Sequence, residues 1–132
     1  MIEKAFAKVH VNYEMISSGT HSEAARFLTG APAHEFKAAV QSVEELWSMI
    51  TNAIKNNYMV TAACFIEWKG LIAGHGYIVQ DFLKFKNRDG SVTKLIKVRN
   101  PWKTIGDQYL KGSSHGNWVG QYSKQDAQSW TD

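Results

Sequence analysis

Cysteine, long apolar runs and an excess of one charge are all scarce in this sequence. Its single cysteine, Cys64, excludes an internal disulfide framework and a cysteine-based metal site, and it indicates a reducing, intracellular setting. No apolar run approaches the roughly 18 residues of a membrane-spanning helix. The start of the chain, MIEKAFAKVH, lacks the apolar core of a signal peptide. A net charge of +3 is too small to indicate a nucleic-acid partner by itself. These absences favour a cytoplasmic protein.

The composition that remains is that of an ordinary globular protein. The chain has 132 residues, 44% of them hydrophobic and 20% charged, which suits one domain with a moderate core and does not indicate disorder. The sequence enters a helical pattern at its first residues, so we expect a segment of a longer chain.

Helical signals fill the first part of the chain. Apolar residues recur at helical spacing from Ile2 to about Ser17. Thr20 or Ser22 can cap a short second helix that ends before TGAP. Ser42 and Glu45 have the spacing of a capping box and precede an apolar stripe, which predicts a third helix. The helical part is therefore expected over about 1–56.

After Tyr58 the pattern of apolar residues changes from helical to strand-like. Three segments, YMVTAACFIEW, HGYIVQDFLKF and VTKLIKVR, are rich in β-branched and aromatic residues and are separated by turns that contain glycine. A short strand over Trp118 to Tyr122 is also expected. The β part then covers about 58–132, and the fold class is α+β, with N-terminal helices followed by an antiparallel β-sheet.

The turn KNRDG brings three polar or aromatic side chains to one end of a hairpin. If the turn is centred on Arg88 to Gly90, the numbers of paired residues sum to about 177 to 179. His75 then lies opposite positions 102 to 104, and Asn100 lies opposite positions 77 to 79. Opposed or diagonal neighbours lie within about 5 to 8 Å of each other, so His75, Asn100 and Trp102 are expected together.

These residues have the chemistry of half a nucleophilic site. A histidine acts as general base when an amide oxygen such as that of Asn100 accepts its ring N–H, and an indole can shield that bond from water. Gly74 and Gly76 would leave room beside His75 for a substrate backbone. From spacing alone, a histidine at a strand end and an Asn-Pro turn are the favoured interpretation, because both are common features.

Several stretches together resemble the calpain family of cysteine proteases. GHGYIV resembles the family's stretch around the catalytic His, and LIKVRNPW resembles the segment with the catalytic Asn and its adjacent Trp. EKAFAKVHVNYEMISSGTHSEAARFLTG and NWVGQYSKQDAQSW extend the likeness over nearly the whole chain. The resemblance implies that residues 1–132 form the second, papain-like subdomain of a calpain-type catalytic domain.

The roles implied by this resemblance are specific. His75 would be the general base and acid, Asn100 would orient it, and Trp102 would shield the pair. Protein or peptide substrates would bind beside Gly74 and Gly76. The family's Cys nucleophile and oxyanion-hole Gln belong to the preceding subdomain, and no matching motif occurs here. We therefore expect the chain alone to be inactive and to need the Cys-bearing subdomain as its partner.

Departures from the family concern calcium. The family binds this ion near the Trp-x-Gly stretch with acidic residues, whereas Asn117 and Lys124 stand at the matching positions here. Because calcium prefers several oxygen ligands, we expect no cofactor or metal in this chain, although the resemblance implies calcium for the whole protein. These changes, together with Lys103 after Asn-Pro-Trp, leave a second reading open: a non-catalytic, calpain-like regulatory or scaffolding module.

Two further features of the sequence bear on function. Cys64 precedes His75 by eleven positions, but it stands in an apolar strand, where a structural thiol is the favoured interpretation. Seven basic residues crowd the segment around the predicted hairpin: Lys84, Lys86, Arg88, Lys94, Lys97, Arg99 and Lys103. A solvated hairpin face is the favoured interpretation, with an anionic membrane surface as an alternative partner and nucleic acid not expected.

Overall fold

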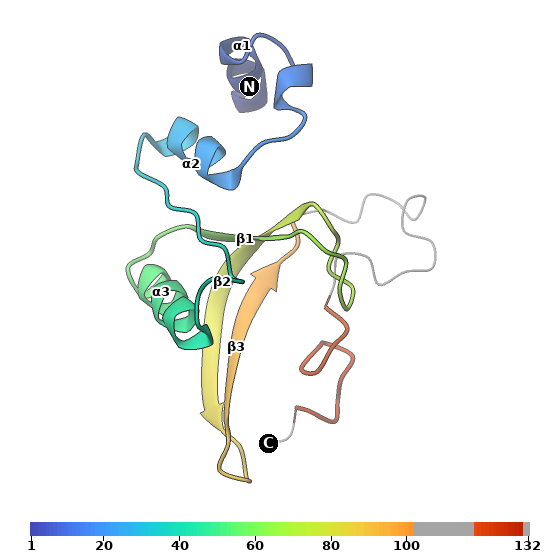
Figure 1. Ribbon diagram of the computed structural model, residues 1–132. Helices are drawn as coiled ribbons and strands as arrows, with labels where there is room; N and C mark the ends of the chain where they lie inside the picture. Colours follow the sequence, from blue (N-terminus) through green and yellow to red (C-terminus); the bar gives the residue numbers. More distant parts are fainter. Residues whose placement is uncertain (102–117, 131–132) are drawn as a thin grey trace. The chain divides into compact units, whose positions relative to one another are not determined.

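The computed structural model describes residues 1–101 and 118–130, so Trp102, Lys103 and Asn117 lie outside the described residues. The chain divides into two compact units, Met1–Leu46 and Trp47–Asp132. Helices occupy the first unit, and an antiparallel sheet dominates the second, as the expected α+β class requires (Figure 1). In the described part of the chain, no helix is both long and apolar enough to cross a membrane.

The first unit contains helix α1 (Ile2–Val9), a 3-10 turn (Glu14–Ile16) and helix α2 (His21–Thr29). Phe6 of α1 packs edge-on against Phe27 of α2, with ring centroids 4.6 Å apart. The Thr20 hydroxyl accepts a hydrogen bond from the Glu23 N–H at 3.3 Å, and Gly30 closes α2 in the left-handed conformation. Capping residues near both ends of α2 thus account for its length.

The prediction of one continuous helix from Ile2 to about Ser17 is wrong. Val11 has φ 80°, and the Asn12 N–H bonds the His10 carbonyl at 3.0 Å, so the backbone makes a γ-turn that ends α1. The Asn12 side chain then accepts a hydrogen bond from the Met15 N–H at 3.0 Å and starts a separate turn. Local hydrogen bonds here override the helical spacing of the apolar residues.

Helix α3 (Val43–Lys55) begins at the predicted capping box. The Ser42 hydroxyl accepts from the Glu45 N–H at 3.2 Å, and the Glu45 carboxylate accepts from the Ser42 N–H at 2.9 Å. Both hydrogen bonds that define the motif are present, so this prediction is confirmed.

The second unit is built on strands β1 (Val60–Cys64), β2 (His75–Lys86) and β3 (Val92–Arg99), in the order β1-β2-β3. The β2–β3 turn is closed by a hydrogen bond from the Asn87 N–H to the Ser91 carbonyl at 2.8 Å. The pairs Ile78–Arg99 and Phe82–Ile96 confirm the predicted hairpin register. The register shifts by one residue between Val79 and Asp81, which makes Gln80 a bulge.

The two faces of the sheet have different covers (Figure 1). On one face, Trp47 of α3 packs edge-on against Phe82, with ring centroids 5.7 Å apart. On the other, Tyr122 of the C-terminal segment packs against Phe85 at 5.8 Å. Residues 118–122 form no strand, contrary to expectation. The Val119 N–H bonds the Lys69 carbonyl at 2.9 Å, outside the three strands, and Tyr122 has φ 60°, which interrupts an extended backbone.

Candidate active site

His75 is the first residue of β2, where the chain leaves a tight loop. Gly74 adopts φ 69°, a conformation that favours glycine, and its N–H bonds the Cys64 carbonyl at 2.7 Å. The His75 N–H bonds the Ile72 carbonyl at 3.3 Å. These contacts fix the backbone on which the imidazole stands, and the His75 side chain is 8% exposed.

Asn100 meets His75 at the end of the neighbouring strand. β3 ends at Arg99, and Pro101 then follows Asn100, which prevents the ladder from continuing. His75 Nε2 lies 2.8 Å from Asn100 Oδ1. The predicted meeting of the two side chains is therefore observed, whereas Trp102, the third member, lies outside the described residues.

This hydrogen bond assigns the protons of the imidazole. An amide oxygen only accepts hydrogen bonds, so Nε2 must carry the hydrogen and donate it to Asn100 Oδ1. In the neutral ring, Nδ1 then holds the lone pair and can accept a proton. The arrangement can therefore perform general base chemistry at Nδ1.

Tyr77 is a member of the site that the sequence analysis missed. Its ring packs edge-on against His75 with centroids 4.8 Å apart, and its side chain is 4% exposed. The Tyr77 hydroxyl accepts a hydrogen bond from the Ile72 N–H at 3.0 Å. Its position two residues after His75, on the same face of one strand, was the available signal.

The glycines beside His75 differ in their surroundings. Among the described residues, a Cβ on Gly74 would meet no atom within 4 Å, so none of them fills the space next to it. Gly76 pairs with Ala63 inside the sheet. Open space at Gly74 is compatible with an approaching substrate backbone, and the substrate role of both glycines stays a prediction.

Cys64 lies directly opposite His75 in the β1–β2 ladder, so the two side chains share a face of the sheet. Its thiol is 2.8 Å from the Ile66 carbonyl, to which it donates, and the residue is half-buried. The expected strand over Cys64 is observed.

Asp126 is the one carboxylate within residues 118–130. Asp126 accepts hydrogen bonds from the Tyr122 N–H at 2.8 Å and the Ser129 N–H at 3.2 Å, so both of its oxygens are engaged. Hydrogen bonds from Ser129 and Tyr122 also hold the pKa of this carboxyl below its usual value. Lys124 adds a positive charge two residues before it. Across residues 1–101 and 118–130, no group of three His, Cys, Asp or Glu side chains could hold a metal ion.

Known proteins are similar to this chain over most of its length. The family model of calpain family cysteine protease matches residues 1–132. The calpain-1 catalytic subunit of Sus scrofa is 30% identical over 94% of this chain, which spans 19% of that protein's length. Calpain-9 of Homo sapiens is 31% identical over 80% of this chain, and the match spans 16% of that protein. With its whole length matched by the family model, the chain belongs to the calpain family of cysteine proteases.

Proposed function

We propose that this chain supplies the His/Asn part of a calpain-type, cytoplasmic cysteine endopeptidase and is inactive without a Cys-bearing subdomain. The observation that carries the proposal is the 2.8 Å hydrogen bond from His75 Nε2 to Asn100 Oδ1 on a buried imidazole. It leaves Nδ1 as the basic nitrogen, which is the requirement for activating a thiol. Family membership supports the same reading.

In the assembled enzyme, His75 Nδ1 takes the proton of the partner's cysteine thiol. The thiolate attacks the carbonyl carbon of a peptide bond, and the C–N bond then breaks as the imidazolium returns the proton to the leaving amine. Water, deprotonated by the same nitrogen, cleaves the thioester and restores the thiol. Asn100 holds the ring in the Nε2–H form throughout. The shielding role of Trp102, which lies outside the described residues, is proposed from the family resemblance alone.

Exposed apolar side chains at the same end of the sheet support a partner there. Phe65 and Ile66, directly after β1, are 84% and 78% exposed. Cys64, the last residue of β1, pairs with His75, so these side chains begin next to the site. The Cys-bearing subdomain would cover them and complete a cleft for a protein or peptide substrate beside Gly74 and Gly76.

The scheme assigns no step to calcium. Each Asp126 oxygen accepts one backbone N–H, and Lys124 adds a positive charge two residues away, so we place no calcium site among the described residues of this chain.

The test combines this chain with a Cys-bearing calpain subdomain and measures kcat/KM on a peptide substrate. The combination is expected to hydrolyse the peptide, and neither part alone is expected to do so. His75→Ala should lower kcat/KM by roughly 10²- to 10⁴-fold, the usual contribution of a general base. Asn100→Ala should also lower it, because the ring then loses its fixed orientation.

Asn87→Ala is the matched control for Asn100→Ala. It removes the same amide, which at Asn87 donates to Ser91 of the β2–β3 turn and to Thr93 of β3, and it should leave kcat/KM unchanged. Hydrolysis by this chain alone, abolished by Cys64→Ser, would contradict the proposal and assign the nucleophile to Cys64.

The alternative is a non-catalytic, calpain-like regulatory or scaffolding module. Lys103 after Asn-Pro-Trp and Lys124 near Asp126 favour it, since both depart from the family pattern. The discriminating observation is the residue that the complete protein holds at the nucleophile position. A cysteine supports the peptidase, and serine, aspartate or lysine supports the module.

A further inference from the structure

Positive charge is concentrated in one hairpin of this molecule. Residues 82–99 contain six basic side chains and one acidic side chain, Asp89. The other 114 residues therefore contain nine basic and eleven acidic side chains. The net positive charge of the chain thus comes from the hairpin formed by β2 and β3.

The end of this hairpin nearest the turn presents four basic residues, which we call the basic tip: Lys84, Lys86, Arg88 and Lys94. Lys84 and Lys94 are direct partners in the ladder and share a face of the sheet. Their direct pairing concentrates two positive charges at one level of the hairpin. Lys55 of α3 adds a fifth positive charge near this face, with its Nζ 5.8 Å from the centre of the Phe82 ring.

The side chains among the basic residues favour a lipid surface over nucleic acid. Aliphatic residues of the hairpin are exposed: Val92 is 53%, Leu83 49% and Ile96 41% accessible. Its aromatic rings are already packed, Phe82 against Trp47 and Phe85 against Tyr122. Single-stranded nucleic acid needs aromatic rings for base stacking. Anionic membranes attract lysine and arginine, and aliphatic side chains can enter the headgroup region.

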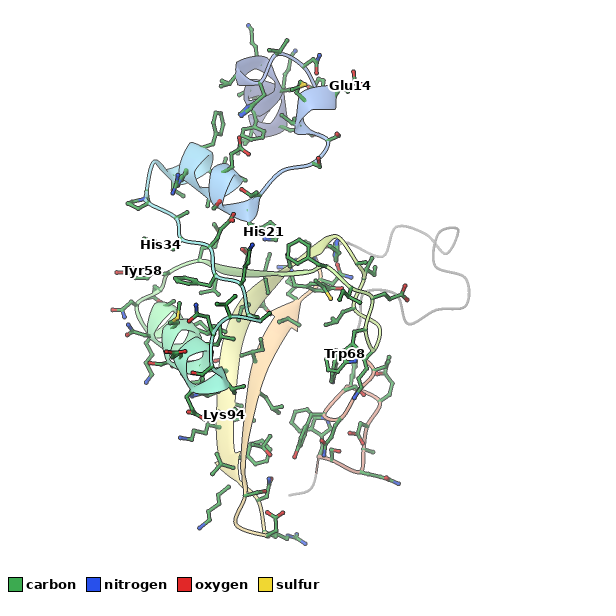
Figure 2. All side chains as sticks on the ribbon, in the orientation of Figure 1. Glu14, His21, His34, Tyr58, Trp68 and Lys94 are labelled. Atoms are coloured by element: carbon green, nitrogen blue, oxygen red, sulfur yellow. The ribbon has the colours of Figure 1, made fainter. Side chains whose placement is uncertain are left out.

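The cation–π contacts of α3 keep part of the basic tip in place. Lys94 Nζ lies 5.7 Å from the centre of the Trp47 ring, and Figure 2 shows Lys94 beside α3. In the turn, the Asp89 carboxylate accepts hydrogen bonds from the Ser91 N–H and hydroxyl at 2.8 and 2.6 Å. Asp89, the acidic residue of the turn, is thus hydrogen-bonded within the turn itself.

The basic tip and the candidate active site lie at opposite ends of β2. The strand runs from His75 to Lys86, roughly 35 Å at the usual rise per residue. We propose that the basic tip docks the protein on an anionic phospholipid surface. Attachment at the turn leaves the His75 end of the hairpin clear of the headgroups, so a membrane-bound molecule can still meet a substrate there.

The test is flotation of the full chain with vesicles of equal parts phosphatidylserine and phosphatidylcholine, compared with vesicles of phosphatidylcholine alone. We expect binding to the anionic vesicles only, weakening as salt screens the charges. Lys84→Gln with Lys86→Gln should weaken this binding by roughly 30-fold, the effect of two lysines near such a surface. Val92→Ser should weaken it further.

Lys4→Gln with Lys8→Gln is the matched control, since it removes the same charge from exposed positions of α1. It should leave vesicle binding within a factor of two to three. Equal weakening by both double variants would overturn the proposal, because net charge alone would then explain binding. Absence of binding to anionic vesicles at low salt would also overturn it, as would capture of oligonucleotides by the same lysines without capture of vesicles. Equal melting temperatures of the variants show that folding is retained.

Discussion

At the scale of residues, a single hydrogen bond determines which nitrogen of the His75 ring can accept a proton. Asn100 Oδ1 holds the hydrogen on Nε2 and leaves Nδ1 basic, while Tyr77 packs edge-on against the imidazole. Tyr77 also ties the site to the loop before β2, because its hydroxyl accepts from the Ile72 N–H. The same Ile72 bonds the His75 backbone through its carbonyl. Tyr77 therefore supports both the ring and the backbone of His75.

Tyr77→Phe is expected to destabilise the chain by about 1 to 2 kcal/mol, because it leaves the Ile72 N–H without its partner while keeping the aromatic ring. Urea unfolding measures this loss. Tyr58→Phe, at a side chain that is 69% exposed, is the control and should change stability by less than about 0.5 kcal/mol. Equal losses in the two variants would show that the Tyr77 hydroxyl does not support the loop.

The sequence could place His75 and Asn100 together because both lie in one hairpin with a recognisable turn. Asn87 to Ser91 closes that turn as expected, and the pairing then follows by counting. Tyr77 was missed since its role depends on the loop that folds back to Ile72, which spacing does not reveal. The catalytic role of each residue came from the family resemblance and stays a prediction.

At the scale of elements, the capping box of α3 carries a pH dependence. Hydrogen bonds from the Ser42 backbone and hydroxyl hold the pKa of Glu45 below its ordinary value of 4.5. The carboxylate form therefore stabilises the helix start in full above pH 4.5 and loses this effect as the pH falls through the lowered pKa.

We expect the helicity measured by circular dichroism to fall on acidification below that range, and Ser42→Ala to reduce the fall by removing the hydroxyl partner. Ser42→Ala should also cost about 1 kcal/mol of stability at neutral pH, the usual cost of losing an N-cap. Glu44→Gln, at the neighbouring position, is the control and should retain the Glu45-dependent change. If helicity falls on acidification in Ser42→Ala as it does in the unchanged chain, the capping box of Ser42 and Glu45 does not cause the fall.

The bulge at Gln80 is an element that alternation alone could not predict. A regular strand would place His75, Tyr77, Val79 and Asp81 on one face. In the structure the extra residue moves Asp81 to the opposite face, so Phe82 joins the face of His75 and meets Trp47. A bulge depends on contacts across the sheet, which the sequence of one strand does not contain. The γ-turn at Val11 has a different, local cause, a backbone hydrogen bond from Asn12 to His10, which apolar spacing does not reveal either.

At the scale of the whole molecule, much apolar surface has no cover within the described residues. Only Ala7, Tyr77 and Val79 are buried hydrophobic residues there. Large apolar side chains remain exposed near the site, above all Phe65 and Ile66, and contiguous exposed apolar surface commonly marks an interface. The whole-molecule expectation is a partner at the His75 end of the sheet.

Phe65→Ser with Ile66→Ser tests this expectation through binding. Because these side chains are 84% and 78% exposed, the double variant should fold with an unchanged melting temperature. Its affinity for a Cys-bearing calpain subdomain should fall by about tenfold or more, since a buried interface anchor contributes over about 1 kcal/mol. Phe36→Ser with Val40→Ser, at exposed positions of the first unit, serves as the control for lost apolar surface. Titration calorimetry measures both affinities.

Retained affinity in the Phe65 and Ile66 variant, or an equal loss in the control, would exclude this end of the sheet as the docking surface, whatever the activity of His75.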